Sequence, residues 1–199
     1  MDFEHEAVLL TEVIDNLKIK EQGIYVDCTI GGAGHSKEIA QHLNSEGQII
    51  GIDQDQAAIE AAAENLSATA PKIDLIRDNY SNLDTILREL DIAEVDGFLF
   101  DLGVSSHQLD EPERGFSYRY DAPLDMRMDQ RQEQTAADIV NNYSKKQLTE
   151  IISEYGEENW AQRIASFIVE QRKEETIETT LELVELIKNA IPASARRSG

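Results

Sequence analysis

The sequence predicts an α/β fold, with a parallel sheet covered by helices on both faces and a helical module after it. Short apolar segments alternate with segments of helical spacing through the first hundred residues, which is the order that builds a parallel sheet. No strand-like segment follows Phe100. The chain has 199 residues, of which 41% are hydrophobic, and this is enough for one domain or one domain with a sizeable insertion.

Four strands and three helices are expected before residue 101. The strands are short apolar runs, predicted over residues 23–28, 48–52, 73–76 and 95–100. The helices are predicted over residues 36–43, 55–66 and 81–90. Asp55 stands before an alanine-rich run and is a suitable N-cap for the second helix.

The next segment, residues 101–129, shows neither helical nor strand periodicity. Long aperiodic segments in a compact domain are uncommon and are usually either functional or disordered. This one keeps apolar and aromatic residues such as Phe116, Tyr118 and Leu124, too many for a solvated tail. We therefore interpret it as an ordered active-site loop that begins at the carboxyl end of the fourth strand.

Helical spacing returns after the loop. Helices are predicted over residues 147–155, 158–173 and 179–190, and Thr179 or Thr180 can cap the last with Glu182 in its first turn. Three parts follow: an N-terminal portion of an α/β core (1–104), an active-site loop (105–135) and a helical domain (136–199), either inserted or appended. The chain ends on ARRSG without a closing element, so we expect a cut there.

Composition narrows the class of protein. A net charge of −21 argues against a basic face across the whole molecule, although it leaves room for a local patch of arginines in or beside the loop. No run approaches the roughly 20 apolar residues of a membrane span, and no secretory signal is present. A single cysteine, Cys28, excludes an internal disulfide and fits a reducing, cytosolic compartment. The four histidines show no metal-ligand spacing.

A glycine-rich turn, Gly31-Gly32-Ala33-Gly34, joins the first strand to the first helix. Glycines let a backbone approach a ligand, and ligands bind beyond the carboxyl ends of parallel strands. His35-Ser36 follow where a P-loop needs Gly-Lys-Ser/Thr, and Lys37 stands at the third position of the dinucleotide fingerprint. These departures favour a nucleoside cofactor without a pyrophosphate; the alternative is a plain strand-to-helix turn.

Three further residues follow the other strands. Asp53, about 20 positions beyond the glycine turn, is suited to binding ribose hydroxyls, because Asp55 serves better as the helix N-cap. Tyr80 can lie against an adenine face, or it simply caps the sheet edge. Asp101, followed by Ser105, Ser106 and Gln108, favours a polar pocket over a structural carboxylate. Cys28 is interpreted as a small core residue, since no nearby cation is evident to activate it.

These motifs resemble those of the MraW/RsmH family of S-adenosylmethionine-dependent methyltransferases, which modify a cytidine of 16S ribosomal RNA on its N4 amine. The resemblance runs nearly end to end, and the loop of residues 101–129 is its most specific part. It is carried by His5-Glu6-Ala7-Val8-Leu9-Leu10, Val26-Asp27-Cys28-Thr29-Ile30-Gly31-Gly32-Ala33-Gly34-His35-Ser36, Ile52-Asp53-Gln54-Asp55, Asp101-Leu102-Gly103-Val104-Ser105-Ser106, Gln108-Leu109-Asp110, Arg114-Gly115-Phe116-Ser117, Pro123-Leu124-Asp125-Met126-Arg127-Met128-Asp129, Tyr155-Gly156-Glu157-Glu158 and Arg163-Ile164-Ala165.

The resemblance implies a Rossmann-like class I methyltransferase sheet with a helical insertion domain. Family members continue past residue 199 with further strands, so the sheet here is expected to be incomplete. The implied partner is 16S rRNA or the small ribosomal subunit in the cytoplasm, with no membrane; a homodimer is compatible with it. The implied cofactor is S-adenosyl-L-methionine, with no metal, and its site would comprise Ala33, Gly34, His35, Asp53, Tyr80, Asp101 and Gln108.

The implied reaction is direct methyl transfer from a sulfonium to the exocyclic amine of cytosine. Asp101 is the candidate catalytic residue, either accepting a hydrogen bond from the amine or contacting the cofactor. Arg114 and Arg127 are candidates for phosphate contacts, the alternative being internal pairing with Asp110, Asp121 or Asp125. Two rival functions remain: a nucleotide-dependent oxidoreductase, and a folded cofactor-binding fragment without catalytic activity.

Overall fold

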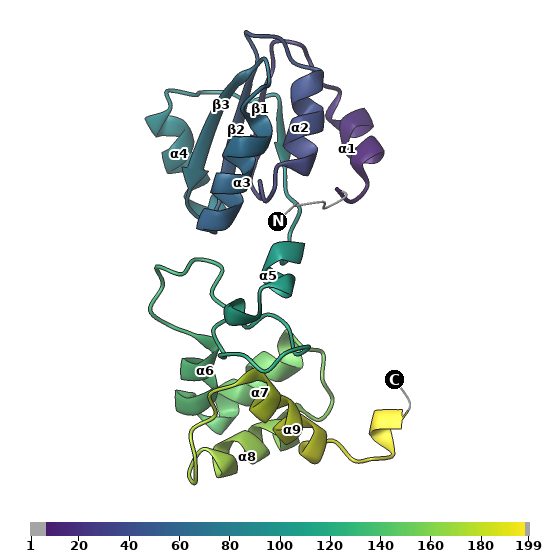
Figure 1. Cartoon of the computed structure of the whole chain (residues 1–199), viewed down its shortest axis with the longest axis vertical. Coiled ribbons are helices and arrows are strands. Elements are labelled where there is room, and N and C mark those ends of the chain that lie inside the picture. Colours follow the sequence, from purple (N-terminus) through teal and green to yellow (C-terminus); the bar gives the residue numbers. More distant parts are fainter. Residues whose placement is uncertain (1–6, 198–199) are drawn as a thin grey trace. The chain divides into compact units, whose positions relative to one another are not determined.

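A parallel four-stranded sheet forms the centre of the first part of the chain (Figure 1). The structure is a computed structural model that describes residues 7–197. The chain divides into a first unit, Met1–Ser105, and a second unit, Ser106–Gly199, and each is described by itself.

The four strands of the first unit lie in the order β3-β2-β1-β4. Their bounds are Ile24–Asp27 (β1), Gln48–Asp53 (β2), Lys72–Arg77 (β3) and Gly97–Leu99 (β4). All three pairings are parallel, and Tyr25 stands opposite both Ile49 and Gly97. The carboxyl ends of all four strands therefore meet at one edge of the sheet, as expected for the alternating order of the sequence.

Helices cover both faces of this sheet, which confirms that prediction. The helices are Leu10–Leu17 (α1), Gly34–Gln41 (α2), Gln56–Leu66 (α3) and Leu83–Glu89 (α4). On one face Tyr25 and Ile49 pack against Ile39 of α2. On the other face the neighbouring strand residue Val26 packs in a cluster with Ile86 of α4 (Figure 1). Successive strand residues point to opposite faces, so apolar residues on both faces require two helical layers.

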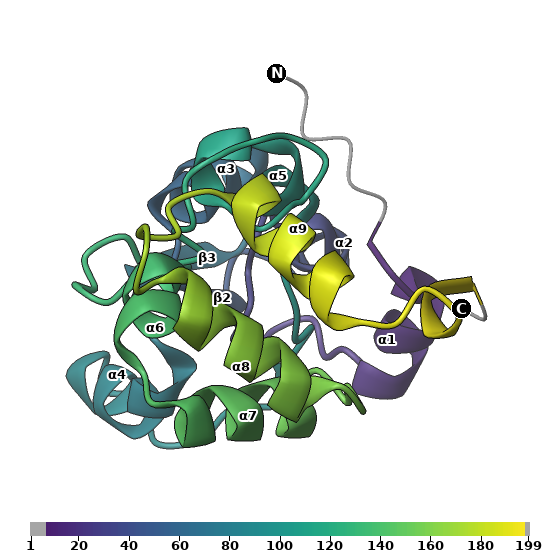
Figure 2. The same cartoon turned by 90° about the horizontal axis from the view of Figure 1, so that it is seen from below.

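The second unit is helical. Its helices are Ser106–Asp110 (α5), Ala136–Asn142 (α6), Lys145–Glu154 (α7), Ala161–Gln171 (α8) and Thr180–Ala190 (α9). Ile164, Ala165 and Ile168 of α8 lie at the centre of its core, and α7 runs beside α8 (Figure 2). Capping boxes begin α6, α7 and α9. In the last of these Thr179 pairs with Glu182, so of the two predicted candidates Thr179, not Thr180, is the cap.

Several predicted elements differ from the structure. The ends of the expected helices and strands move by a few residues, and α1, α5 and α6 had not been expected. The expectation that residues 101–129 lack regular structure was wrong for α5 and for the 3-10 turn Pro112–Arg114. These elements are only one or two turns long, and an apolar period cannot be recognised over so few residues.

The loop at the start of the second unit is ordered by hydrogen bonds between its own residues. The guanidinium group of Arg114 is buried and donates to the carbonyl groups of Arg127 and Met128, at 2.9 and 3.2 Å. The amide of Met126 donates to the carbonyl of Arg114 at 2.9 Å. Because one side chain holds two carbonyls from the far end of the loop, the loop closes on itself.

Gly115 is required by this closure, because its φ of 70° is unfavourable for other residues and a β-carbon there would lie 2.4 Å from the carbonyl oxygen of Pro123. We expect Gly115→Ala to lower the free energy of unfolding of the second unit by at least about 1–2 kcal/mol. Urea unfolding followed by circular dichroism measures this. The control is Gly103→Ala, where a β-carbon meets nothing within 4 Å. Equal unfolding midpoints for the two variants would contradict the prediction.

Candidate active site

The candidate site residues of the first unit lie at the carboxyl edge of its sheet. The glycine turn follows β1, Asp53 ends β2, Tyr80 follows β3 and Asp101 follows β4. In open parallel sheets this edge is where ligands bind. The element order thus brings together residues that are up to 68 positions apart in the sequence, since Ala33 and Asp101 lie at the same edge.

The glycine turn adopts left-handed backbone conformations at Gly31 (φ 48°) and at Ala33 (φ 63°). Ala33 is buried and directly precedes α2, whose first residues are Gly34 and His35. The first N–H groups of a helix have no partner inside it, and they carry a partial positive charge. The turn therefore presents N–H groups of Gly34 and His35 to the edge of the sheet. The side chain of His35 forms a hydrogen bond away from the turn: its Nε2 donates to the carbonyl of Val8 at 2.9 Å.

Asp53 is bonded directly to the glycine turn. One carboxylate oxygen accepts from the amide of Gly31 at 3.0 Å, and the other accepts from the amide of Asp55 at 2.9 Å. Burial raises the pKa of Asp53, although these two N–H bonds favour its charged form. Each carboxylate oxygen can accept a second hydrogen bond, so a ribose diol remains within its capacity. Asp55 caps α3 by accepting from the amide of Ala57, which confirms its predicted role.

Asp27, at the end of β1, had not been assigned a role from the sequence. Its side chain is buried, with one carboxylate oxygen accepting from Ser36 Oγ at 2.7 Å and the other from the amide of Thr29 at 3.1 Å. Burial raises its pKa, while both hydrogen bonds oppose the rise. These bonds cross the base of the glycine turn. The sequence feature that could have indicated this role is an acidic residue at the end of a buried apolar strand, because a buried charged group needs hydrogen-bond partners.

An aromatic pair lies beside this edge. The rings of Tyr80 and Phe100 meet edge to face, with centroids 5.7 Å apart and planes at 89°. Tyr80 is 40% exposed and Phe100 is 46% exposed, so both rings keep surface for a planar group. Phe100 had been treated only as part of a strand; its exposure depends on packing, which the apolar run did not reveal.

Asp101 is exposed, and its amide donates to Thr29 Oγ1 at 2.7 Å. Ala33, Gly34, His35, Asp53 and Asp101 are thus linked to one edge of one sheet. Gln108 is buried on α5 of the second unit.

Cys28 is a core residue, as predicted. Its side chain is 2% exposed, and burial raises the pKa of the thiol to about 11, so the reactive thiolate is disfavoured near neutral pH. Among residues 7–197, no group of three or more His, Cys, Asp or Glu side chains is arranged to hold a metal ion. Within the same residues, no helix is long and apolar enough to cross a membrane.

The two arginines suggested for phosphate contacts have internal partners in the structure. Arg127 forms an ion pair with Asp125, with Nη2 and Oδ2 2.6 Å apart, and this lowers the pKa of that carboxyl. Arg114 holds main-chain carbonyls, as described above. The alternative of internal pairing with an aspartate is confirmed for Arg127, whose partner is Asp125. Arg114 is also used inside the loop, through bonds to main-chain carbonyls.

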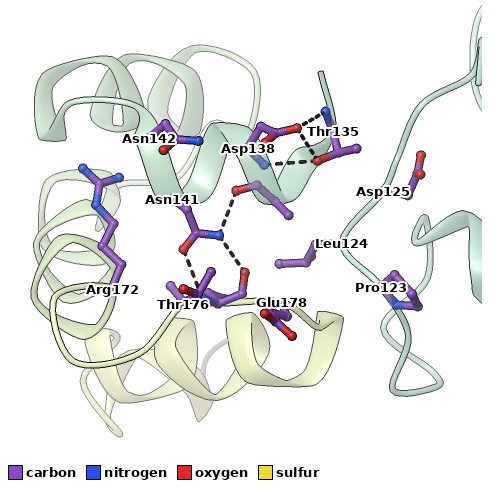
Figure 3. A pocket seen from close by; sticks show the side chains of 12 residues that line it. Pro123, Leu124, Asp125, Thr135, Asp138, Asn141, Asn142, Arg172, Thr176 and Glu178 are labelled. Carbon is purple, nitrogen blue, oxygen red and sulfur yellow. Dashed lines mark hydrogen bonds between the residues drawn. The ribbon is translucent and has the colours of Figure 1, made fainter. Parts of the chain in front are cut away.

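A pocket of about 500 Å³ lies within the second unit, between α6, the end of α8 and the segment before α9 (Figure 3). Asn141 spans it: its amide group donates to the carbonyls of Ala137 and Ile177, at 2.9 and 2.7 Å, and its oxygen accepts from the amide of Ile177. Thr135 and Asp138 on its wall form the capping box of α6. The side chains of Asn141, Thr135 and Asp138 thus form hydrogen bonds within the fold.

The fold and the carboxyl-edge site define an α/β domain of the nucleoside-cofactor-binding class. Within that class, the chain belongs to the MraW methylase family, whose model matches residues 2–199. This confirms the resemblance drawn from the sequence motifs and the α/β, Rossmann-like fold class. The family is one of S-adenosylmethionine-dependent enzymes.

Curated relatives extend the comparison. The chain is 56% identical over its whole length to "Ribosomal RNA small subunit methyltransferase H" of Clostridioides difficile (strain 630) and covers 64% of that protein. It is 55% identical over 98% of its length to the protein of the same name from Halothermothrix orenii, of which it covers 63%. A solved structure described as a putative rRNA-methylase from Clostridium thermocellum matches 53% of the chain at 23% identity, with a TM-score of 0.44. The chain thus spans somewhat less than two thirds of the length of the curated relatives.

The raised pKa of Asp27 predicts how stability depends on pH. Between the unfolded-state pKa of about 3.9 and the higher folded-state value, the folded state binds more protons than the unfolded state. The contribution of this carboxyl to stability is therefore complete below about pH 4 and is lost as the pH rises through the folded pKa. Asp27→Asn removes this dependence, so we expect the free energy of unfolding of the variant, relative to the wild type, to increase as the pH is raised.

Urea unfolding at a series of pH values between 4 and 7 measures this difference. Asp84→Asn, at an exposed position of α4, controls for the loss of one carboxylate. A variant-to-wild-type difference for Asp27 that stays constant, or that changes in the opposite direction, would show that burial does not raise this pKa.

Proposed function

We propose that this protein is a methyltransferase that transfers the methyl group of S-adenosylmethionine to the N4 amine of a cytidine in 16S rRNA of the small ribosomal subunit, in the cytoplasm. The observation that carries the proposal is the bond between Asp53 and the glycine turn at the carboxyl edge of a sheet, in a chain of the MraW methylase family. Relatives more than 50% identical bear the name of a small-subunit rRNA methyltransferase, which supports the substrate class.

The residues of the site fit the chemical groups of this cofactor. The Asp53 carboxylate can accept from the two ribose hydroxyls, and the exposed face of Tyr80 suits adenine. The N–H groups of Gly34 and His35, next to Ala33, suit the carboxylate of the methionine portion, because a helix N-terminus favours an anion. Asp101 and Gln108 are the further residues proposed to contact the cofactor. When bound, the cofactor supplies a methyl group on a positively charged sulfur.

The amine of cytosine is a poor nucleophile, because its lone pair is delocalised into the ring. The site helps by holding the nitrogen in line with the methyl group, which lowers the entropic part of the barrier. Asp101 is proposed to accept a hydrogen bond from the amine as positive charge develops on it. A cytosine must leave its stack to reach such an edge, which suits a single-stranded or looped RNA.

The second unit is proposed to be a helical domain inserted into the methyltransferase core of a longer protein. β4 lies at the end of the strand order in the described sheet, and Phe98 on it is 45% exposed. An exposed edge and an exposed aromatic residue on one strand suit pairing with another strand. The greater length of the curated relatives leaves residues for such a strand. A homodimer stays a prediction.

The alternative function is cofactor binding without turnover. The specific observation in its favour is that the chain spans 64% of its relatives, so groups needed for the chemistry can lie outside it. Cofactor binding and methyl transfer therefore need separate measurements.

Cofactor binding is tested by calorimetric titration of this chain with S-adenosylmethionine. We expect saturable binding by the wild type and at least about tenfold weaker binding by Asp53→Ala, since two charge-assisted hydrogen bonds to the ribose are lost. Asp84→Asn is the matched control and should bind as the wild type does. Because Asp53 also holds Gly31, thermal unfolding of both variants must show that the fold persists. A folded wild-type chain that does not bind would contradict the proposal for this chain.

Methyl transfer is tested with small ribosomal subunits that lack the modification, by detecting N4-methylcytidine with mass spectrometry. We expect Asp101→Asn to lower turnover by about 10²–10³ if its carboxylate accepts the amine proton in a hydrogen bond, with little change in cofactor affinity. Weaker cofactor binding with unchanged turnover at saturation would assign Asp101 to cofactor contact. Binding without any transfer by the wild type would support the alternative function.

A further inference from the structure

Thr29 lies between the glycine turn and the end of β4, and it is bonded on both sides. Its amide donates to the Asp27 carboxylate at 3.1 Å, and its hydroxyl oxygen accepts from the amide of Asp101 at 2.7 Å. Immediately before it, the amide of Cys28 donates to the carbonyl of Leu99 at 2.9 Å. The hydrogen bonding between the ends of β1 and β4 therefore continues past the backbone bond from Cys28 to Leu99, and its next bond uses the side-chain oxygen of Thr29.

This bond occurs where the two strands end. In a parallel ladder, the amide of each second residue donates to a carbonyl of the neighbouring strand. The amide of Asp101 donates instead to a hydroxyl, so the place of its main chain depends on one side-chain atom of Thr29. Asp101 is exposed, and water can satisfy an exposed amide. The bond therefore contributes more to the position of Asp101 than to the stability of the sheet.

The main chain of Thr29 is fixed by the Asp27 carboxylate. The buried Asp27 carboxylate accepts from the amide of Thr29, before the glycine turn, and from Ser36 Oγ, after it. One carboxylate thus fixes the two ends of the turn that carries Gly31 and Ala33. The hydroxyl of Thr29 has a fixed place relative to that turn, and Asp101 is bonded to the hydroxyl.

We propose that Thr29 is a positioning residue of the methyl-transfer site: its hydroxyl sets the distance between the glycine turn and the main chain of Asp101. The inference rests on the proposed function, because it assigns the glycine turn to the cofactor and Asp101 to the reacting end of the site. Thr29 touches neither reactant; it acts through Asp101. Valine has nearly the shape of threonine and lacks the acceptor, whereas serine keeps the acceptor and loses a methyl group.

The test compares Thr29→Val with Thr29→Ser in the whole 199-residue chain. Amide hydrogen exchange, resolved by NMR, reports the bond directly and needs no cofactor. We expect the Asp101 amide to exchange at least about tenfold faster in Thr29→Val and about as in the wild type in Thr29→Ser. The Cys28 amide, which bonds to Leu99, is the internal reference and should keep its rate in both variants.

The second readout is methyl transfer to small ribosomal subunits that lack the modification. We expect Thr29→Val to turn over about three- to tenfold more slowly than the wild type, at an unchanged melting temperature and an unchanged affinity for S-adenosylmethionine, and Thr29→Ser to restore the rate. An unchanged Asp101 exchange rate in Thr29→Val, or equal loss of turnover in both variants, would overturn the inference. A wild-type chain that neither binds the cofactor nor transfers its methyl group counts against the proposed function instead; the exchange rates then decide by themselves whether Thr29 holds Asp101.

Discussion

The Asp27 carboxylate accepts hydrogen bonds from residues on both sides of the glycine turn, and the geometry of the site depends on this arrangement. A buried carboxylate is costly unless it is well bonded, and Asp27 has both Ser36 Oγ and the amide of Thr29 as donors. These two bonds fix the positions of Thr29 and Ser36 relative to the end of β1. A turn with left-handed residues at Gly31 and Ala33 would otherwise have many accessible shapes.

The rest of the edge is assembled on this turn by single hydrogen bonds. Asp53 reaches it from β2 through the amide of Gly31, and Asp101 reaches it from β4 through the hydroxyl of Thr29. Each bond joins a strand end to the same short segment. The candidate site is therefore a set of side chains held relative to one another by main-chain donors, which is the preorganisation that binding and catalysis require.

The second unit is stabilised by different means. Three of its helices, α6, α7 and α9, begin with capping boxes at Thr135, Ser144 and Thr179, which satisfy N–H groups of their first turns locally. Its loop is closed by the guanidinium group of Arg114 and by the Asp125–Arg127 pair. A positive side chain in the middle of a polar motif suggests a phosphate ligand, yet here the charge is used to fold the loop.

The sequence by itself determined the four strands and the helices between them, the two-sided sheet, the cap at Asp55 and the carboxyl-edge location of Asp53 and Asp101. These features follow from local patterns: apolar periodicity, capping chemistry and the parallel topology that alternating elements impose. Only the tertiary structure decided that Asp27 braces the turn, that Thr29 holds Asp101, that Phe100 contacts Tyr80, and that Arg114 points inward. Each of these depends on which distant groups come within hydrogen-bonding or van der Waals distance, and a linear pattern does not contain that distance.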